Sequence, residues 1–210
     1  MFINSVNLAT KENIKIGSKT ELTGIYKRPV ATAIVGPLGL DGDAIVSEKH
    51  HGGPDQAVYV YTLPDYELWQ KAGVNVEPGI FGENLTLSHL RSAELAVGDR
   101  LLFKEVELEV TSPRIPCATL ASRMGDDHFV AKFVAMEAPG FYCRVLRGGQ
   151  VSVLEEFSYL PYGGERVKVL ELFANYYEKA PTRENLQRYL ASPLAIRTRK
   201  ENEKRLAKMA

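Results

Sequence analysis

One change in the spacing of apolar residues limits the folds open to this chain. Up to about Leu154, apolar residues occur in short stretches interrupted by Gly, Pro, Asn and Asp, which is typical of strands joined by turns. Beyond Glu155 they recur at helical spacing instead. A chain of 210 residues can therefore form one sizeable β-rich core with a small helical appendage.

The first part is predicted to be mostly β-structure. Val106, Leu108 and Val110 alternate with glutamates, which is the pattern of a strand with one wet face. The segment 147–150, Arg-Gly-Gly-Gln between two apolar stretches, predicts a tight hairpin turn. The predicted strands cover residues 31–35, 57–61, 84–87, 100–103 and 106–111.

Helices are sparser in this part of the chain. Residues 64–72, 116–124 and 126–136 are predicted to form them, with Tyr66 and Trp69 near one face of the first. Many short strands with few helices favour a barrel or sandwich with helical insertions.

The last part is predicted to hold three helices. The first covers residues 165–179, the second opens after Thr182 as its N-cap, and the third follows Pro193. We therefore expect a β-rich domain over residues 1–157 and a three-helix extension over residues 158–210. The first helix should carry one apolar stripe, made of Val169, Leu172, Phe173 and Tyr176.

The overall composition narrows the class of protein. Lys plus Arg equals Asp plus Glu at 26 each, which argues against a general nucleic-acid binder. No secretory signal opens the chain, and no apolar run approaches the roughly 20 residues that cross a bilayer. We expect a cytoplasmic protein without a membrane partner, whose two cysteines are thiols.

Cys117 is the strongest candidate for a chemical role. It follows a predicted strand and the segment Pro113-Arg114-Ile115-Pro116, and a helix is expected to begin at Pro116. A thiol in a first helical turn beside an arginine has a lowered pKa, and its thiolate is a nucleophile and a soft metal ligand. The alternative is a buried structural cysteine. Cys143 fits that alternative, because it shares a strand face with Phe141 and Val145.

Two glycine-rich segments could approach a ligand closely. His50-His51-Gly52-Gly53-Pro54 could cradle a phosphate through backbone N–H groups, although a plain turn is the simpler interpretation. In Gly82-Glu83-Asn84, the amide of Asn84 offers both a donor and an acceptor to a heterocycle. The basic run at 197–208 is typical of a solvated helix face.

Read together and in order, these motifs resemble the MOSC family, named for the C-terminal domain of molybdenum-cofactor sulfurases. The helical tail further resembles the extension of the stand-alone bacterial YiiM-type branch, associated with resistance to 6-N-hydroxylaminopurine. The residues that carry the family resemblance are Gly39 to Asp43, His51-Gly52-Gly53-Pro54, Gly82-Glu83-Asn84, Gly98-Asp99, Arg114-x-Pro116-Cys117 and Gly140-Phe141-Tyr142-x-Arg144-Val145.

The resemblance implies a mostly β, MOSC-type barrel with helical insertions, which the C-terminal helices make α+β overall. It also implies a molybdenum cofactor of the molybdopterin type, with Cys117 as its metal ligand and as the catalytic residue. Relatives often have Lys or Arg two residues after this cysteine. Here Thr119 stands, so that cationic contact is missing or supplied elsewhere. The implied contacts to the cofactor's phosphate and pterin are His51, Gly52, Gly53, Asn84, Arg114 and Arg144.

Three functional hypotheses follow. The leading one is an oxidoreductase that reduces N-hydroxylated compounds such as 6-N-hydroxylaminopurine, with electrons from a flavin or iron–sulfur protein. The alternative is a sulfur-carrier or cofactor-handling module that holds a persulfide on Cys117. Residues 1–38 are too few for a pyridoxal-phosphate desulfurase, which favours the reductase. In the third, the cysteine is inert.

Overall fold

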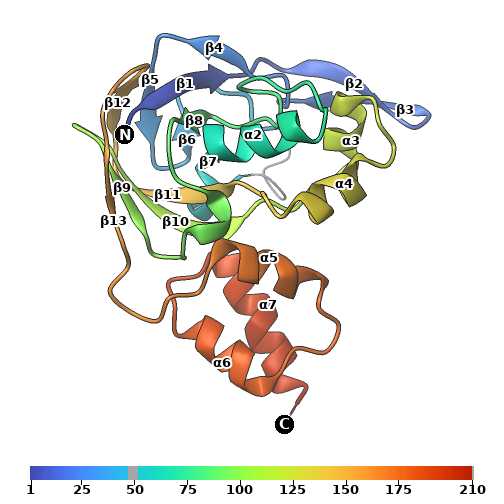
Figure 1. Cartoon of the computed structure of the whole chain (residues 1–210), viewed down its shortest axis with the longest axis vertical. Coiled ribbons are helices and arrows are strands. Elements are labelled where there is room, and N and C mark those ends of the chain that lie inside the picture. The colour runs from blue at the N-terminus through green and yellow to red at the C-terminus, as the bar shows by residue number, and fades with distance from the viewer. Residues whose placement is uncertain (47–51, 210) are drawn as a thin grey trace.

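The computed structural model describes residues 1–46 and 52–209, and an eight-stranded sheet forms its centre (Figure 1). This sheet has seven pairs of neighbouring strands. One pair, β7 with β8, is parallel, and the other six are antiparallel. The order across the sheet is β13 (Ser158–Leu160), β9 (Arg100–Leu102), β10 (Glu107–Pro113), β11 (Phe141–Arg147), β7 (Val58–Thr62), β8 (Leu85–Leu87), β1 (Ile3–Leu8) and β4 (Arg28–Val30).

Two smaller sheets complete the β-structure. The first has the order β12 (Gly149–Ser152), β5 (Thr32–Gly36), β6 (Gly39–Leu40), and the second is the hairpin of β2 (Glu12–Ile16) with β3 (Lys19–Thr23). Each of the five predicted strands has a counterpart within two residues of its expected bounds.

The predicted closed barrel is not confirmed. Among the described residues the large sheet has two ends, β13 and β4, which do not pair with each other. Backbone hydrogen bonds join the start of β1 to the segment before β13 instead, for example from Ile3 N to Glu155 O at 3.0 Å. The coarser expectation holds, since the fold is mixed α+β around a large sheet.

The predicted hairpin at residues 147–150 is wrong. Strands β11 and β12 are separated only by Gly148, but β12 pairs with β5, whereas β11 pairs with β10 and β7. The glycines therefore turn the chain from one sheet into another. Gly149 has φ 159°, and a Cβ there would lie 2.6 Å from the Glu105 side chain.

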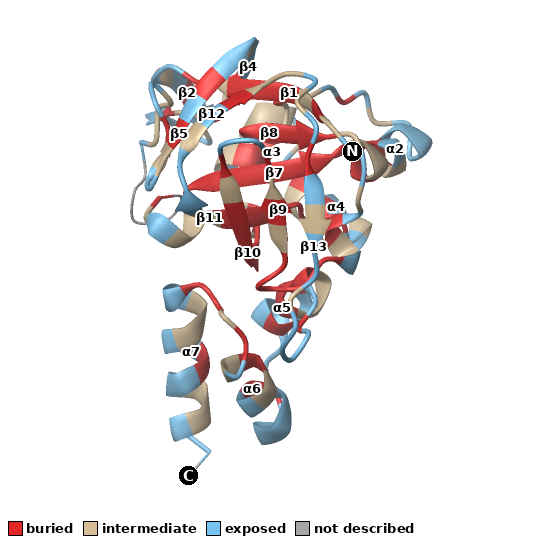
Figure 2. Ribbon diagram, turned by 90° about the vertical axis from the view of Figure 1, so that its left-hand side faces the viewer, coloured by how far each residue is buried: buried red, intermediate tan, exposed pale blue. Residues whose placement is uncertain are grey.

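Strand β7 shows how the sequence builds a core on each face of the large sheet. All five of its residues are buried (Figure 2). Val58 and Val60 join an aliphatic core, whereas Tyr59 and Tyr61 join an aromatic core on the opposite face. Successive strand side chains point to opposite faces, so the alternation of Val and Tyr specifies both cores.

Helices α2 (Leu63–Lys71), α3 (Ala118–Met124) and α4 (Phe129–Met136) cover the aromatic core, and Phe173 from the C-terminal extension also joins it. Trp69 of α2 stacks on Phe129 of α4 with ring centroids 5.1 Å apart. Two of these helices begin later than predicted, α3 at Ala118 and α4 at Phe129. The chain before α3 is still extended at Cys117, with φ −137° and ψ 172°, so this residue is the N-cap.

The C-terminal extension contains α5 (Val169–Tyr177), α6 (Arg183–Leu190) and α7 (Ile196–Ala207), which lie together beside the β-rich part (Figure 1). Thr182 is confirmed as the N-cap of α6, because its side chain accepts a hydrogen bond from Asn185 N at 3.1 Å. Tyr176 departs from the predicted apolar stripe, since it is 63% exposed.

The extension is attached to the β-rich part through backbone hydrogen bonds. Val97 N donates to Val167 O at 2.9 Å, and Val169 N donates to Leu95 O at 2.8 Å. Strand β13 still belongs to the large sheet, so the sheet reaches Leu160. The division into units at residue 157 stays a prediction.

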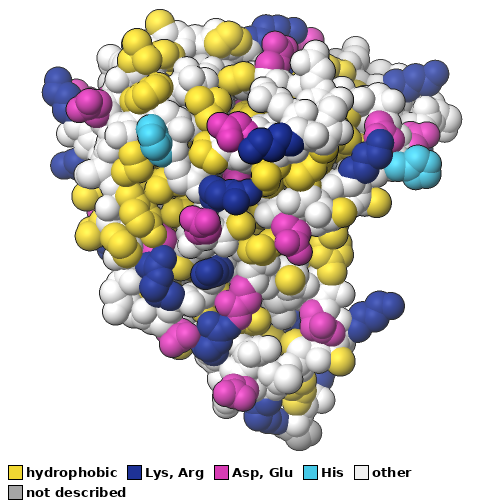
Figure 3. All heavy atoms as spheres, in the orientation of Figure 1, with side chains coloured by type: hydrophobic (Ala, Val, Ile, Leu, Met, Phe, Trp, Pro, Cys, Tyr) yellow, Lys and Arg dark blue, Asp and Glu magenta, His cyan; other side chains and the backbone are white. Residues whose placement is uncertain are grey.

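The charged surface is mixed in sign. On the face shown in Figure 3, lysines and arginines are interspersed with aspartates and glutamates and form no continuous basic patch. None of the helices that the structure describes combines the length and apolar character needed to cross a membrane.

Candidate functional site

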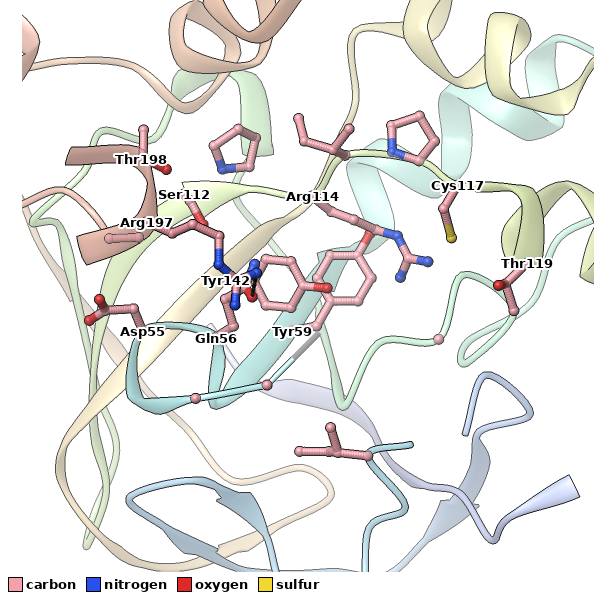
Figure 4. A pocket seen from close by; sticks show the side chains of 18 of the residues that line it. Asp55, Gln56, Tyr59, Ser112, Arg114, Cys117, Thr119, Tyr142, Arg197 and Thr198 are labelled. Carbon is pink, nitrogen blue, oxygen red and sulfur yellow. Dashed lines mark hydrogen bonds between the residues drawn. The ribbon is translucent and has the colours of Figure 1, made fainter. Parts of the chain in front are cut away.

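A cavity of about 1350 Å³ lies between the β-rich part and the extension. On the β-rich side we define its floor as Tyr59, Ser112, Arg114, Cys117 and Tyr142. Opposite, we define the helical wall as Tyr176 of α5 with Ile196, Arg197 and Thr198 of α7. Figure 4 shows the floor residues together with Arg197 and Thr198. A volume of this size suits a cofactor or a drug-sized ligand.

Cys117 lies in this cavity, as a catalytic or ligating cysteine must. Strand β10 ends at Pro113, and α3 begins at Ala118, so Cys117 ends the short connection that crosses the cavity. Its side chain is partly exposed, and Figure 4 shows its sulfur on the same side as the guanidinium of Arg114. Cys143, in contrast, is fully buried in the aliphatic core, where burial raises its thiol pKa.

Arg114 is the cation of the floor, and it is only 5% exposed. One of its terminal nitrogens donates to Phe81 O at 2.7 Å, and its guanidinium lies 4.9 Å from the centre of the Tyr59 ring. Burial works to lower the pKa of Arg114. The negative forms of Tyr142, Tyr59, Cys117 and Glu83 together outweigh burial and raise that pKa. The charge of Arg114 therefore favours the thiolate form of Cys117.

Two buried polar atoms of the floor have no hydrogen-bond partner among the described residues. They are Nε of Arg114 and Oγ of Ser112, whose side chains belong to residues only 5% and 6% exposed. A buried donor or acceptor without a partner costs about 1–3 kcal/mol. Both residues line the cavity, so a bound polar group could satisfy both atoms.

The glycine-rich segment lies at the edge of this cavity. Gly52 and Gly53 both line it, and Gly53 has φ 96°, a backbone conformation that glycine adopts without strain. The predicted contact His51 and its neighbour His50 lie outside the described residues. The described part of the segment thus places backbone, rather than side chain, against the cavity.

Asn84 also lines the cavity, but its amide is already used by the protein. Its Oδ1 accepts from Tyr59 N at 3.2 Å, and its Nδ2 donates to Asp43 at 2.8 Å. Asp43 in turn forms an ion pair with Lys27, whose side chain is only 7% exposed and lines the cavity as well. The structure therefore gives Asn84 a role in holding the cavity's edge together.

Arg144 does not belong to the described lining of the cavity. Its Nε lies 2.9 Å from a carboxylate oxygen of Asp55, and it also pairs with Glu109 at 3.4 Å. Another nitrogen of its guanidinium donates to Pro193 O and Leu194 O, both at 3.1 Å. In this structure Arg144 joins the sheet to the extension, so its predicted cofactor contact has no support in the geometry.

Arg197 is the cation that sequence reasoning missed. It extends from the start of α7 toward Tyr142 of the floor, and it donates to Gln56 Oε1 at 3.1 Å (Figure 4). The only signal in the sequence was the basic run at 197–208, which is interpreted most simply as a solvated face. That the run begins at the cavity depends on how the extension packs, which its own sequence does not reveal.

The surroundings of Cys117 show which kind of metal-bearing group would fit there. Among the described residues, no group of three or more His, Cys, Asp or Glu side chains could hold a metal ion. A metal bound by Cys117 would therefore take most of its ligands from a bound cofactor rather than from protein side chains. A soft thiolate in a roomy, partly polar cavity fits such a group.

Comparison with protein families and sequences places these features in context. The model of the MOSC domain matches residues 47–158, just over half of the chain. YflK of Bacillus subtilis (strain 168) is 34% identical over 173 residues, which cover 81% of this chain and 77% of the relative. Protein YiiM of Escherichia coli (strain K12) is 38% identical over 88 residues, 40% of this chain and 39% of the relative.

A further relative and a solved structure extend the comparison. A protein named Reductase, from Gibberella moniliformis (strain M3125 / FGSC 7600), is 30% identical over 139 residues, which cover 60% of this chain and 25% of the relative. The crystal structure of YiiM from Geobacillus stearothermophilus has a TM-score of 0.80 at 25% identity and covers 98% of both chains. The likeness to that structure thus includes the three C-terminal helices.

Proposed function

This chain belongs to the MOSC domain family and is of the YiiM type, and from that premise we propose that it is a molybdenum-dependent reductase. In this proposal Cys117 ligates the metal of a molybdopterin-type cofactor, and the substrates are N-hydroxylated compounds such as 6-N-hydroxylaminopurine. The single observation that carries the proposal is the position of Cys117 beside Arg114 in the large cavity.

The floor has the properties that the proposed cofactor requires. The thiolate of Cys117 is a soft ligand, and the charge of Arg114 favours that thiolate. Nε of Arg114 and Oγ of Ser112 are buried polar atoms that the cofactor's polar groups could satisfy. Gly52 and Gly53 leave room for close backbone approach.

When bound, the cofactor would supply the redox chemistry: the N–OH group becomes N–H and its oxygen leaves as water, with two protons from solvent and two electrons from a flavin or iron–sulfur protein. The chain's own residues would perform three tasks. Cys117 would fix the position of the metal, and Arg114 would keep the thiolate charged. The helical wall would confine the substrate to the space above the floor. We place this reaction in the cytoplasm, where thiols stay reduced.

The test is to express the protein in a host that makes the cofactor, and to measure bound molybdenum, pterin and the reduction of 6-N-hydroxylaminopurine. We expect Cys117→Ser to lose bound metal and at least about 100-fold of the activity. Cys143→Ala is the matched control, which should lower stability but retain the metal, because Cys143 lies in the core. Full activity of Cys117→Ser would contradict the proposal.

The sulfur-carrier alternative predicts a different measurement on the same protein. Mass spectrometry after gentle purification would then find an adduct of about 32 Da, one sulfur atom, on Cys117. Pterin and molybdenum would be absent. The partly exposed position of Cys117 would permit either chemistry, so the bound species decides between them.

The inert-cysteine hypothesis is tested by alkylation of the metal-free protein near neutral pH. A reactive Cys117 should be alkylated at least about 100 times faster than the fully buried Cys143. Equally slow reaction of both thiols would favour inertness.

A further inference from the structure

The feature that the proposed function leaves unexplained is Arg197, the second residue of α7. Its Nη1 donates to Gln56 Oε1, and Figure 4 shows its side chain directed from the extension toward Tyr142. Two basic residues of the last helix line the cavity, Arg197 and Arg205, and Arg205 already donates to the carbonyls of Asn175 and Glu178. The extension therefore places a positive charge against the floor of the β-rich part.

Tyr142 lies between two positive charges. Burial raises the pKa of this tyrosine, and the charges of Arg114 and Arg197 both act to lower it. One arginine comes from the connection after β10 and the other from the start of α7, which are distant in sequence. Two positive charges that flank one buried ring create a positive potential in the cavity that they line, which favours a negatively charged ligand there.

Ser112 supplies an independent sign of a missing ligand. Its Oγ is buried without a partner, and Figure 4 shows the residue beside Arg197 and Tyr142. Nε of Arg114 is also buried without a partner. A hydroxyl and an arginine edge are donors of the kind that phosphate oxygens accept from.

Asp55, an acid beside the start of α7, is already engaged. One carboxylate oxygen of Asp55 pairs with Arg144, and the other accepts from Ile196 N at 2.6 Å. Asp55 thus holds the start of α7 in place and leaves the side chain of the next residue, Arg197, directed into the cavity.

We propose that Arg197, Arg114 and Ser112 form a subsite for a phosphate monoester, shared between the β-rich part and the extension. The subsite replaces the cationic contact that Thr119 cannot provide, and it makes the extension part of the binding site. Only the source of the phosphate rests on the proposed function: it is either the cofactor or a substrate that is a nucleotide rather than a free base.

The first measurement does not need a working enzyme. Isothermal titration of the metal-free protein with inorganic phosphate and with AMP should show binding that Arg197→Gln weakens about tenfold or more, as expected for a charge-assisted contact. Lys200→Gln is the control, because it removes the same charge from the same helix at an exposed position outside the described lining. Equal affinities for the wild type and both variants, or equal losses in both, would overturn the subsite.

Two further measurements on the holoprotein identify the source. If the phosphate belongs to the cofactor, Arg197→Gln should purify with less pterin than Lys200→Gln. If it belongs to the substrate, pterin content should be unchanged, while KM rises about tenfold for the 5′-phosphate of the hydroxylaminopurine nucleoside and stays constant for the free base. Unchanged pterin content and unchanged KM in Arg197→Gln would overturn the proposal. Phosphate binding that depends on Arg197, in a protein without reductase activity, would refute the proposed function alone.

Discussion

The two sides of the cavity differ in how far they are buried. The floor holds Cys117, the candidate chemical residue, whereas the helical wall belongs to the attached extension. The floor is part of the folded core: Tyr59, Arg114 and Tyr142 are each at most 5% exposed. The helical wall is open to solvent, with Ile196 55% and Tyr176 63% exposed. A buried floor is fixed once the domain folds, whereas an exposed wall depends on the contacts that attach it.

The start of α7 is attached to the β-rich part through polar contacts, whereas Val169 and Phe173 of α5 are buried in its two cores. Asp55 joins the start of α7 to the glycine-rich segment, Arg144 reaches the carbonyls at 193 and 194, and Ala195 N donates to Thr111 O at 3.3 Å. The comparison therefore predicts that substitutions in the floor affect the whole fold. Substitutions at the polar contacts between the start of α7 and the β-rich part should affect the extension alone.

The largest effect is expected for Arg114→Met. This change removes a buried cation, leaves Phe81 O without its partner and ends the contact with the Tyr59 ring. The free energy of unfolding should fall by about 2–3 kcal/mol, measured by urea denaturation at pH 7. Arg28→Met, at an exposed ion pair with Glu12, is the control and should change little. An equal change in the free energy of unfolding of the two variants would show that the buried contacts of Arg114 do not stabilise the floor.

Asp55→Asn should loosen the wall and leave the floor intact. An amide cannot accept from Ile196 N and pair with Arg144 as the carboxylate does, so we expect a loss of about 1–2 kcal/mol. Hydrogen exchange should quicken in the first turn of α7 and stay slow in β10. Uniformly faster exchange throughout the molecule would mean that the junction supports the whole fold, against the comparison.

The floor could be predicted from the sequence because its signals are local. The alternation of Val and Tyr in β7 follows from strand periodicity, and the prolines around Arg114 mark the end of β10. The sequence predicts Cys117 in the first turn of a helix that begins at Pro116, whereas α3 begins two residues later, at Ala118, and Cys117 is its N-cap. The difference arises because the chain is still extended at Cys117, before α3 begins.

The helical wall could not be predicted, because its role depends on contacts between distant segments. Arg144 and Arg197 carry the same charge, and nothing in their neighbouring residues reveals which one faces the cavity. The contacts of Asp55 determine which arginine faces the cavity, because this residue pairs with Arg144 and accepts a hydrogen bond from Ile196 N at the start of α7. The change of sheet at Gly148 is a similar case, since two glycines fit a hairpin and a crossing between sheets equally well.

A smaller effect, confined to the extension, is expected for Thr182→Ala. The change removes the acceptor for Asn185 N and should cost about 1 kcal/mol, a fall of about 2–4 °C in Tm for a chain of this size. Thr182→Ser keeps the hydroxyl and should restore the stability. Phosphate affinity should be unchanged in both, because Thr182 lies away from the described lining of the cavity.

The smallest effect concerns Glu83, a buried carboxyl behind the floor that accepts from Tyr66, Gly79 and Thr86. Burial raises its pKa above the ordinary value of 4.5, so the folded protein holds this proton more tightly than the unfolded chain does. Its contribution to stability is therefore present at low pH and declines as the pH rises from about 4.5 toward the raised value. Glu83→Gln cannot ionise, so its stability relative to the wild type should increase as the pH rises from about 4.5 into the neutral range. Thermal melts across that range measure the difference. A difference that stays flat would show that Glu83 remains ionised in the fold and that the floor stabilises a buried charge.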